Sequence, residues 1–298
     1  MIISASYKTD LPAFYGAWFA NRLAAGYCRV VNPYGGPPFT VPLTPETVDG
    51  FVFWTRNTEP FLDGLAMVRN LKFPFVIQYT ITGYPRALES SVLDAERSVA
   101  QVHALAATYG PRAVVWRYDP VIFTSLTPAR WHLERFAALA KALAGAVDEV
   151  VLSFAHVYRK TARNLEAAAR AHAFTWRDAE PEEKQTLLAE FASIARDHGL
   201  TLGLCGQDSL RIPGVEEARC IDARRLGDIA GRTIPARPRP HRSCGCVQSR
   251  DIGAYETCPH GCVYCYAVSR RAEARRRHQL HDPLGAFLFP PAMPPPSD

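Results

Sequence analysis

Three cysteines near the carboxyl end of the chain have a spacing that is typical of a metal centre. Cys258, Cys262 and Cys265 form a C-x3-C-x2-C pattern in a loop that also contains Pro259 and Gly261. Thiolates bind soft metals, above all zinc and the iron of iron–sulfur clusters. Zinc sites more often use C-x2-C pairs, so this spacing favours a [4Fe–4S] cluster. A cluster held by three cysteines leaves one iron without a protein ligand, and that iron can bind a substrate or a cofactor.

The other five cysteines divide into a group of four and one isolated residue. Four thiolates would close a second [4Fe–4S] cluster or a structural zinc site, and the candidates are Cys205, Cys220, Cys244 and Cys246. Zinc is also the alternative metal for the C-x3-C-x2-C loop, where His260 would be available as a ligand. Cys28 stands alone in an apolar stretch, so we expect it to be a buried free thiol.

The composition is that of a globular protein of ordinary size. Its 298 residues suffice for one large α/β domain or two small ones. No apolar run approaches the roughly 20 residues that a membrane span needs, and residues 1–6 lack the basic and long apolar parts of a signal peptide. We therefore expect a cytoplasmic protein with no membrane partner. In that reducing compartment, clustered cysteines indicate metal or redox chemistry more often than disulfides.

Positive charge is mild overall and concentrated near the carboxyl end. The formal net charge is +5, and much of the excess lies in segments 232–242 and 270–277. The second segment follows the cysteine loop, so its arginines could contact a nucleotide or a nucleic acid; they are Arg270, Arg271, Arg275, Arg276 and Arg277. A solvated helix face is the alternative, and the scarcity of aromatic residues among these arginines disfavours stacking on single-stranded nucleic acid.

Strand-like and helix-like segments alternate along most of the chain. Short apolar runs predict six strands, over residues 2–6, 50–54, 75–81, 113–116, 149–154 and 200–204. Amphipathic spacing predicts helices over residues 10–25, 61–70, 91–109, 128–143, 161–172, 181–198 and 266–278. The alternation indicates a parallel sheet in an α/β fold. Six such units favour a (β/α) barrel, partial or complete, over a doubly wound sheet. We expect residues 1–232 to form this barrel domain and residues 233–298 to form a cysteine-rich, cluster-binding segment that packs on its mouth.

Polar residues follow the predicted strands at their carboxyl ends, the edge at which (β/α) barrels build their active sites. Arg117 and Asp119 flank Tyr118, so strand alternation places both on one face. There they could anchor a substrate carboxylate or phosphate, with a structural ion pair as the alternative. Lys8 and Asp10 end the first strand in a similar way, so these four residues are the catalytic candidates. Arg56 and Asn57 follow the second core strand and are candidates for holding an anionic cofactor or substrate.

Several stretches make the chain similar to a known bacterial family. They are residues 12–16 (PAFYG), 53–57 (FWTRN), 116–120 (WRYDP), 220–222 (CID) and 244–267. By these stretches the chain is identified as a member of the family called domain of unknown function 1848 (DUF1848). The resemblance covers nearly the whole chain, and because the chemistry of this family is not established, it implies no reaction.

The cysteine loop resembles a second group of proteins. Its pattern, C-x3-C-x-Tyr-C followed by Tyr-Ala, is similar to the cluster loop of radical S-adenosylmethionine (SAM) enzymes, particularly the spore photoproduct lyase-like branch. The resemblance implies that SAM binds the open iron, that Tyr264 lines its adenine, and that a reductant such as flavodoxin or ferredoxin triggers radical formation. In those enzymes the loop follows the first strand of a partial barrel. Here it follows all six units, so we expect it to pack back onto the barrel rim.

The sequence thus favours an iron–sulfur enzyme with radical SAM-like chemistry on an anionic substrate, either a small molecule or a nucleotide. The glycine-rich stretch that usually holds the amino group of SAM is absent, and the nearest glycine pair is Gly203 and Gly206. The first alternative is an iron–sulfur redox protein that does not use SAM. The second is a zinc protein that binds nucleic acid through its basic carboxyl-terminal helix.

Overall fold

The six apolar segments form the core strands of one sheet, as their composition predicts. In the computed structural model, which describes residues 1–33, 35–239 and 244–291, they are β1 (Ile2–Ala5), β4 (Gly50–Thr55), β5 (Phe75–Thr80), β6 (Val114–Val121), β8 (Glu149–Phe154) and β10 (Thr201–Leu204). Two short strands lie at the edges, β11 (Glu216–Glu217) and β12 (Ser249–Asp251). The sheet order is β11-β10-β8-β6-β5-β4-β1-β12, and every pairing in it is parallel. The predicted parallel α/β sheet is therefore confirmed.

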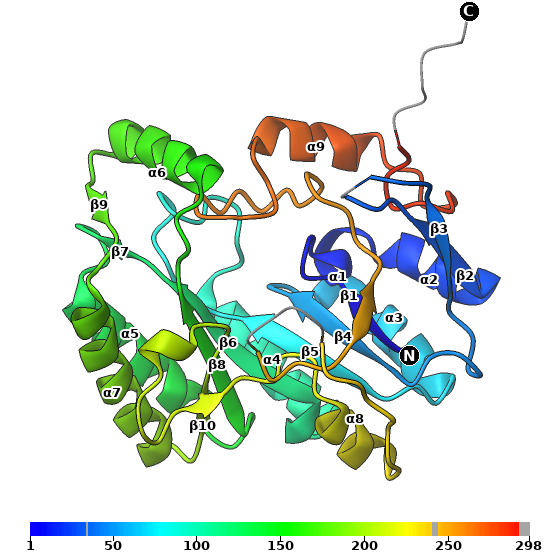
Figure 1. Ribbon diagram of the computed structural model, residues 1–298, viewed down its shortest axis with the longest axis horizontal. Coiled ribbons are helices and arrows are strands. Elements are labelled where there is room, and N and C mark those ends of the chain that lie inside the picture. Colours follow the sequence, from blue (N-terminus) through cyan, green and yellow to red (C-terminus); the bar gives the residue numbers. More distant parts are fainter. Residues whose placement is uncertain (34, 240–243, 292–298) are drawn as a thin grey trace, which may run out of the picture.

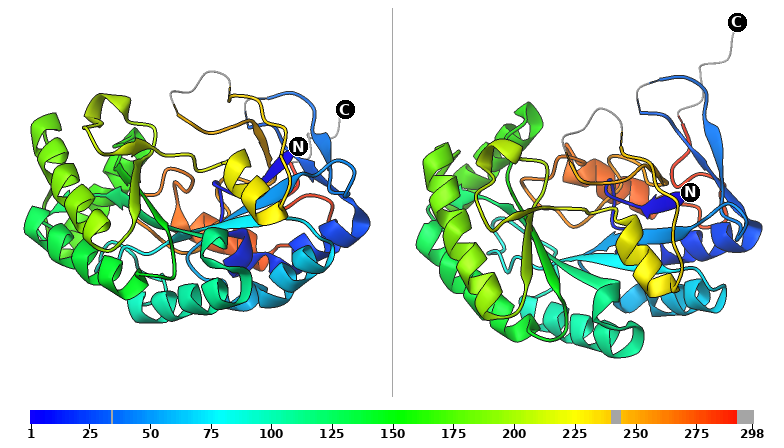
Figure 2. Two further views of the ribbon diagram at one scale, coloured as in Figure 1. Left: turned by 90° about the horizontal axis from the view of Figure 1, so that it is seen from below. Right: turned by 60° about the horizontal axis from the view of Figure 1, so that its bottom comes forward.

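Helices cover the outer face of this curved sheet. They include α3 (Leu62–Asn70), α4 (Ala95–Tyr109), α5 (Ala129–Leu143) and α7 (Pro181–Asp197) (Figures 1 and 2). The larger apolar core lies between the sheet and these helices, and its fully buried members include Phe51, Phe53 and Trp116. Alternate strand residues such as Val52 and Val115 belong to a separate cluster with α8 (Ala223–Ala230). Because both faces of the sheet are buried, the sequences of its core strands are continuous apolar runs.

The carboxyl-terminal segment returns to the sheet. Strand β12 pairs in parallel with β1, in the register Ile2↔Ser249, although the two strands are far apart in the sequence. This second pairing partner of β1 was not predicted, because β12 is short and polar. The edge strands β11 and β12 have no pairing with one another within the described residues, but the backbone N–H of Val247 donates to the carbonyl of Ile221 between them, at 3.1 Å.

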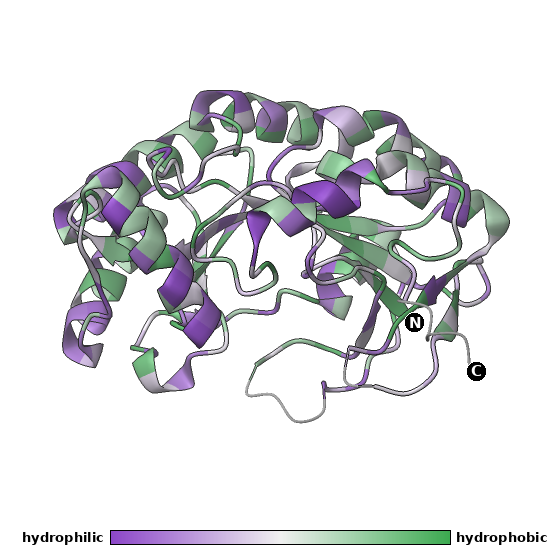
Figure 3. Ribbon diagram, turned by 90° about the horizontal axis from the view of Figure 1, so that it is seen from above, coloured by the Kyte–Doolittle hydropathy of each residue, from purple (hydrophilic) through white to green (hydrophobic). Residues whose placement is uncertain are grey.

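Two small antiparallel strand pairs lie outside the main sheet. The antiparallel pairs are β2 (Tyr27–Val30) with β3 (Phe39–Pro42), and β7 (Phe123–Thr124) with β9 (Trp176–Arg177). Two helices are basic, α6 (Arg159–His172) and α9 (Arg271–Gln279). Figure 3 shows apolar strands at the centre and polar residues on the outward helix surfaces. Within the described part of the chain, no helix combines the length and the apolarity that crossing a membrane requires.

The predicted first helix is interrupted. Asp10 caps α1 (Leu11–Phe14), since its Oδ1 accepts from the Ala13 N–H at 2.9 Å. The chain leaves the helical conformation at Tyr15 and resumes in α2 (Gly16–Ala25). The Tyr15 hydroxyl donates to the carbonyl of Thr257 at 2.6 Å, so the break lies at a contact with the carboxyl-terminal segment.

Two other helices begin four or five residues later than predicted. Helix α4 begins at Ala95 instead of residue 91, because the backbone before it bonds to the cysteine loop: Ser91 N–H donates to the His260 carbonyl at 3.1 Å. Helix α9 begins at Arg271 instead of residue 266, because the Ser269 N–H donates to the carboxylate of Glu256 at 2.8 Å. Both of these predicted first turns thus lie in segments whose backbone bonds to other parts of the chain.

Candidate functional site

The cysteine loop, residues 258–265, packs at the carboxyl ends of β1, β4 and β5. A β-bridge joins Cys262 to Glu89, and the Val263 N–H donates to the Leu88 carbonyl at 3.0 Å. On its other side, His260 Nε2 lies 2.8 Å from Asp10 Oδ2, just beyond β1. The loop therefore lies at the edge of the sheet where the strand-end pattern predicts the site.

The three loop sulfurs lie close enough to one another to interact electrostatically. Burial raises the pKa of all three thiols above its ordinary value, that of Cys262 to about 12, and the neighbouring loop thiols add to the effect for Cys258 and Cys262. One of these sulfurs accepts a hydrogen bond, since the Ala267 N–H donates to Cys265 Sγ at 3.3 Å. The His260 backbone and the Tyr264 side chain oppose the rise in thiol pKa at Cys258 and Cys262, respectively.

A buried polar group formed by Arg56, Glu89 and Tyr264 lies beside these thiols. The Arg56 guanidinium contacts Glu89 Oε1 at 2.8 Å and donates to the Tyr264 hydroxyl at 2.8 Å. The Tyr264 hydroxyl in turn donates to the Glu89 carboxylate, which also accepts from Thr82 Oγ1 at 2.8 Å. The structure thus brings together two of the predicted cofactor-binding residues. Glu89 was missed, because it lies nine residues beyond the end of β5 and outside any strand-end pattern.

The third residue of that prediction, Asn57, is separate from the buried group. Its side-chain oxygen accepts from Gln101 Nε2 at 2.8 Å and from the Glu59 N–H at 3.1 Å. Asn57 lines a cavity of about 300 Å³ next to the loop, together with Phe14, Arg86, Arg97, His260 and five further residues.

Lys8 and Asp10 end the first strand as predicted but have different partners. Lys8 Nζ lies 3.4 Å from Asp251 Oδ1 in β12, and both side chains are buried. The Asp251 carboxylate also accepts from the hydroxyls of Ser4, at 2.9 Å, and Ser6, at 2.8 Å. Asp10, by contrast, caps α1 and accepts from the backbone N–H of Arg56 at 2.8 Å. Asp251 was missed because only the parallel pairing of β12 with β1 reveals its position.

Arg117 and Asp119 lie on one face of β6, as strand alternation predicts. Arg117 Nη2 and Nε lie 2.6 Å and 3.1 Å from Asp119 Oδ2, while Nη1 donates to Gln78 Oε1 at 3.1 Å. The guanidinium also lies 4.9 Å from the centre of the Trp54 ring. An incoming anion would have to displace the Asp119 carboxylate, so the ion pair described as the structural alternative is present.

The second group of cysteines also converges. The sulfurs of Cys205 and Cys220 are 3.5 Å apart, and Arg117 Nη1 donates to Cys220 Sγ at 3.1 Å. Cys246 is near enough to Cys220, and Cys244 to Cys246, to affect the pKa of its thiol. Hydrogen bonds from the Cys205 and Cys246 thiols, aided by Arg117, hold the pKa of Cys220 well below its ordinary value.

Cys28 lies apart from both groups. It is fully buried in the outer core, as predicted, and burial raises the pKa of its thiol to about 12. Among the residues that the structure describes, no group of three or more His, Cys, Asp or Glu side chains is arranged to hold a metal ion.

The arginines of α9 are only partly available to a ligand. Arg276 and Arg277 pair with Glu273 at 2.9 Å, and Arg277 also lies over the Phe289 ring. Arg271 packs on the cysteine loop and donates to the Ser91 hydroxyl at 2.5 Å. Arg270 and Arg275 are exposed.

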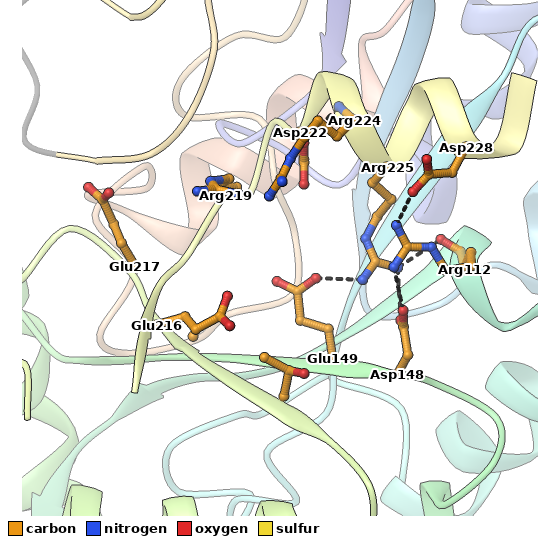
Figure 4. A pocket seen from close by; sticks show the side chains of 12 residues that line it. Arg112, Asp148, Glu149, Glu216, Glu217, Arg219, Asp222, Arg224, Arg225 and Asp228 are labelled. Atoms are coloured by element: carbon orange, nitrogen blue, oxygen red, sulfur yellow. Dashed lines mark hydrogen bonds and ion pairs between the residues drawn. The ribbon is translucent and has the colours of Figure 1, made fainter. Parts of the chain in front are cut away.

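A larger cavity, of about 350 Å³, lies at the opposite, amino edge of the sheet (Figure 4). Five of its charged side chains pair with one another. Arg225 contacts Asp148 at 2.9 Å and Glu149 at 2.5 Å, and Arg112 contacts Asp148 and Asp228. None of the predicted site residues lines this cavity.

Comparison with known proteins identifies a family. No curated protein matches the chain. A solved structure from Bacteroides thetaiotaomicron that carries the name of a putative alpha-L-fucosidase covers 78% of this chain and 84% of its own, at 8% identity and a TM-score of 0.28, and this likeness supports no argument about fold or function. The profile of a domain of unknown function, DUF1848, matches residues 2–267. The chain therefore belongs to the DUF1848 family.

Proposed function

We propose that this protein is an iron–sulfur enzyme in which Cys258, Cys262 and Cys265 hold a [4Fe–4S] cluster. The observation that carries the proposal is the convergence of three half-buried loop thiols that influence one another's pKa, one of which, Cys265 Sγ, accepts from the Ala267 N–H at 3.3 Å. Such bonds stabilise negative charge on sulfur and are a main means by which proteins tune cluster-ligating thiolates.

A cluster suits this loop better than a single zinc ion. A zinc ion needs its donors around one point, and no group of three or more suitable side chains in the described residues has that arrangement. A [4Fe–4S] cluster is a cube of eight atoms, so its cysteine ligands stand farther apart around it. The three loop thiols interact electrostatically but do not meet at one point, and this arrangement is compatible with a [4Fe–4S] cluster.

The surroundings can balance the negative charge of thiolates. Arg56 and Lys160 both act electrostatically on Cys265 and favour its charged form. When bound, the cluster would supply one-electron redox chemistry, and an iron without a protein ligand would offer a place for SAM. Tyr264 would present its ring to such a ligand from a fixed position, because Arg56 and Glu89 hold its hydroxyl.

The strand order supports the barrel form of this proposal. From β1 through β11, neighbouring strands follow one another in chain order, as in a (β/α) barrel, whereas a doubly wound sheet reverses direction at a switch point. We infer a partial barrel whose carboxyl edge carries the cysteine loop.

The cavity of about 300 Å³ beside the loop is the place we propose for an anionic substrate. Its two arginines pair with solvent-exposed carboxylates, Arg97 with Glu59 at 3.0 Å and Arg86 with Asp94. Exposed ion pairs contribute little to stability, so an anion can replace these partners at small cost. His260, which lies between two of the loop cysteines, lines the same cavity.

Anaerobic reconstitution tests this function. We expect about four irons and four sulfides per chain, with loss of both in Cys258→Ala. The matched control is Cys28→Ala, which removes a buried thiol remote from the loop and should retain the cluster. EPR of the reduced protein, with and without SAM, then distinguishes a radical SAM enzyme from an iron–sulfur redox protein that does not use SAM. A spectrum that changes with SAM supports the radical SAM interpretation, an unchanged one indicates a redox protein that does not use SAM, and zinc without sulfide contradicts the cluster.

A further inference from the structure

We propose that Cys205 and Cys220 form a redox-active dithiol, which a small peroxide converts to a disulfide. The two residues come from different parts of the chain. Cys205 directly follows β10, and Cys220 lies three residues beyond β11. The parallel pairing of these strands, extended by a hydrogen bond from the Ala218 N–H to the Leu204 carbonyl at 3.0 Å, brings the two sulfurs to 3.5 Å.

The surrounding contacts hold the pair in this position. The carbonyl of Cys220 accepts from Gln78 Nε2 at 3.0 Å, and its sulfur accepts from Arg117 Nη1 at 3.1 Å. The backbone N–H of Cys205 donates to the Leu152 carbonyl at 2.8 Å. Both cysteines are therefore tied to the central strands, and disulfide formation would shorten the distance between their sulfurs from 3.5 Å to about 2 Å.

The same geometry favours a dithiol over a single bound metal ion. A thiolate-bound ion needs at least three donors about one point, and the described residues contain no such group. A disulfide needs two sulfurs only, and these two are already in contact. Cys205 is half-buried and so accessible to a small oxidant, whereas Cys220 is 3% exposed.

The chemistry balances with hydrogen peroxide as the oxidant. One thiol attacks a peroxide oxygen and breaks the O–O bond, giving a sulfenic acid and one water. The second sulfur attacks the sulfenic sulfur and displaces its oxygen as a second water, which forms the S–S bond. The two cysteines lose two electrons and two protons, and the peroxide is reduced to two waters.

Oxidation of the Cys205–Cys220 pair would affect the polar residues at the carboxyl end of β6 through Arg117. This guanidinium bonds to Cys220 Sγ and to Asp119 Oδ2. A disulfide sulfur is a weaker acceptor than a thiolate, so disulfide formation loosens one of the contacts that fix Arg117. The redox state of the pair is thereby connected to the carboxyl end of β6.

Peptide mapping tests the proposal on the full chain, purified without oxygen and treated with one equivalent of peroxide. Trypsin places Cys205 in peptide 197–211, Cys220 in 220–224, Cys244 and Cys246 in 243–250, and the loop cysteines in 251–270. We expect a cross-linked species joining 197–211 to 220–224, which dithiothreitol separates again. Cys205→Ser should abolish it, and Cys246→Ser should leave it in place.

Three results would overturn the proposal. They are the absence of that species while other cysteines oxidise, a link from 220–224 to 243–250 as the main product, and a metal ion in the native mass spectrum that Cys205→Ser removes. The outcome does not depend on the iron–sulfur proposal, because the loop cysteines lie in a different peptide and iron and sulfide are counted separately.

Discussion

Arg56, Glu89 and Tyr264 form a buried polar group in which each side chain satisfies the other two. The Glu89 carboxylate is 3% exposed and accepts from Arg56, Thr82 and Tyr264. A buried guanidinium without its carboxylate is costly, because water cannot replace the lost partner. The position of Tyr264 beside the cysteine loop therefore depends on Glu89, a residue of the segment between β5 and α4.

Glu89→Gln should lower the free energy of unfolding by about 3 kcal/mol or more, since it leaves the Arg56 charge buried without a counter-charge. Urea denaturation measures the change. The control is Glu59→Gln, which breaks the pair with Arg97, where both side chains are at least 60% exposed. The control should change stability by no more than about 0.5 kcal/mol. Equal losses of unfolding free energy in the two variants would show that burial of the Arg56–Glu89 pair does not increase its contribution to stability.

At the scale of elements, the cysteine loop and α9 pack closely against each other. Gly261 has a φ of +76°, and a Cβ there would lie 2.4 Å from Arg271 Nε and 2.5 Å from Ser90 Oγ. The segment before α4 also bonds to the loop, through the Ser91 N–H and the His260 carbonyl, and the segment before α9 bonds to Glu256, two residues before the loop. The loop is thus positioned by the two elements that flank it.

Gly261→Ala should displace the loop and lower the iron bound after reconstitution as well as the melting temperature. Gly145→Ala is the matched control, because Gly145 has a nearly equal φ of +78° but no atom within 4 Å of the point that an alanine Cβ would occupy. Both variants carry the same backbone strain, of about 1 kcal/mol, so their difference isolates the collision. Full iron binding by Gly261→Ala would contradict this packing argument.

At the scale of the whole molecule, the sheet gathers residues that are remote in the chain. Strand β12 places Asp251 beside Lys8, and the loop after it places His260 beside Asp10. The outer core also buries a histidine. His132 is fully buried, with Nε2 donating to the Ile122 carbonyl at 3.0 Å and Nδ1 accepting from the Tyr118 hydroxyl at 2.9 Å.

Acidification should destabilise the fold through His132. Burial lowers its pKa from 6.5 to about 4, so between these values the unfolded chain binds a proton that the folded chain does not. Stability is then lost as the pH falls through this window, by about 2 kcal/mol between pH 7 and pH 5. Urea titrations of wild type and His132→Gln at both pH values measure it. The variant should be less stable at pH 7 but show a smaller loss on acidification; equal losses would exclude His132 as the source.

The sequence determined the local features of this protein. Continuous apolar runs predicted all six core strands, because a strand buried on both faces must be apolar throughout. Asp10 and Gly26 mark the two ends of the first helical region, because capping depends on the residue itself. The cysteine spacing and the strand alternation of Arg117 and Asp119 likewise required no knowledge of the fold.

Only the tertiary structure decided which of these features meet. Strand β12 is three polar residues long, so its place beside β1, and the role of Asp251 with it, depends on pairing between segments at opposite ends of the chain. The same holds for Glu89 with Tyr264 and for Cys205 with Cys220, whose contacts join separate segments. Spacing along a chain limits which residues can share a helix face or a strand, but contacts between distant segments are set by how the sheet and its loops pack.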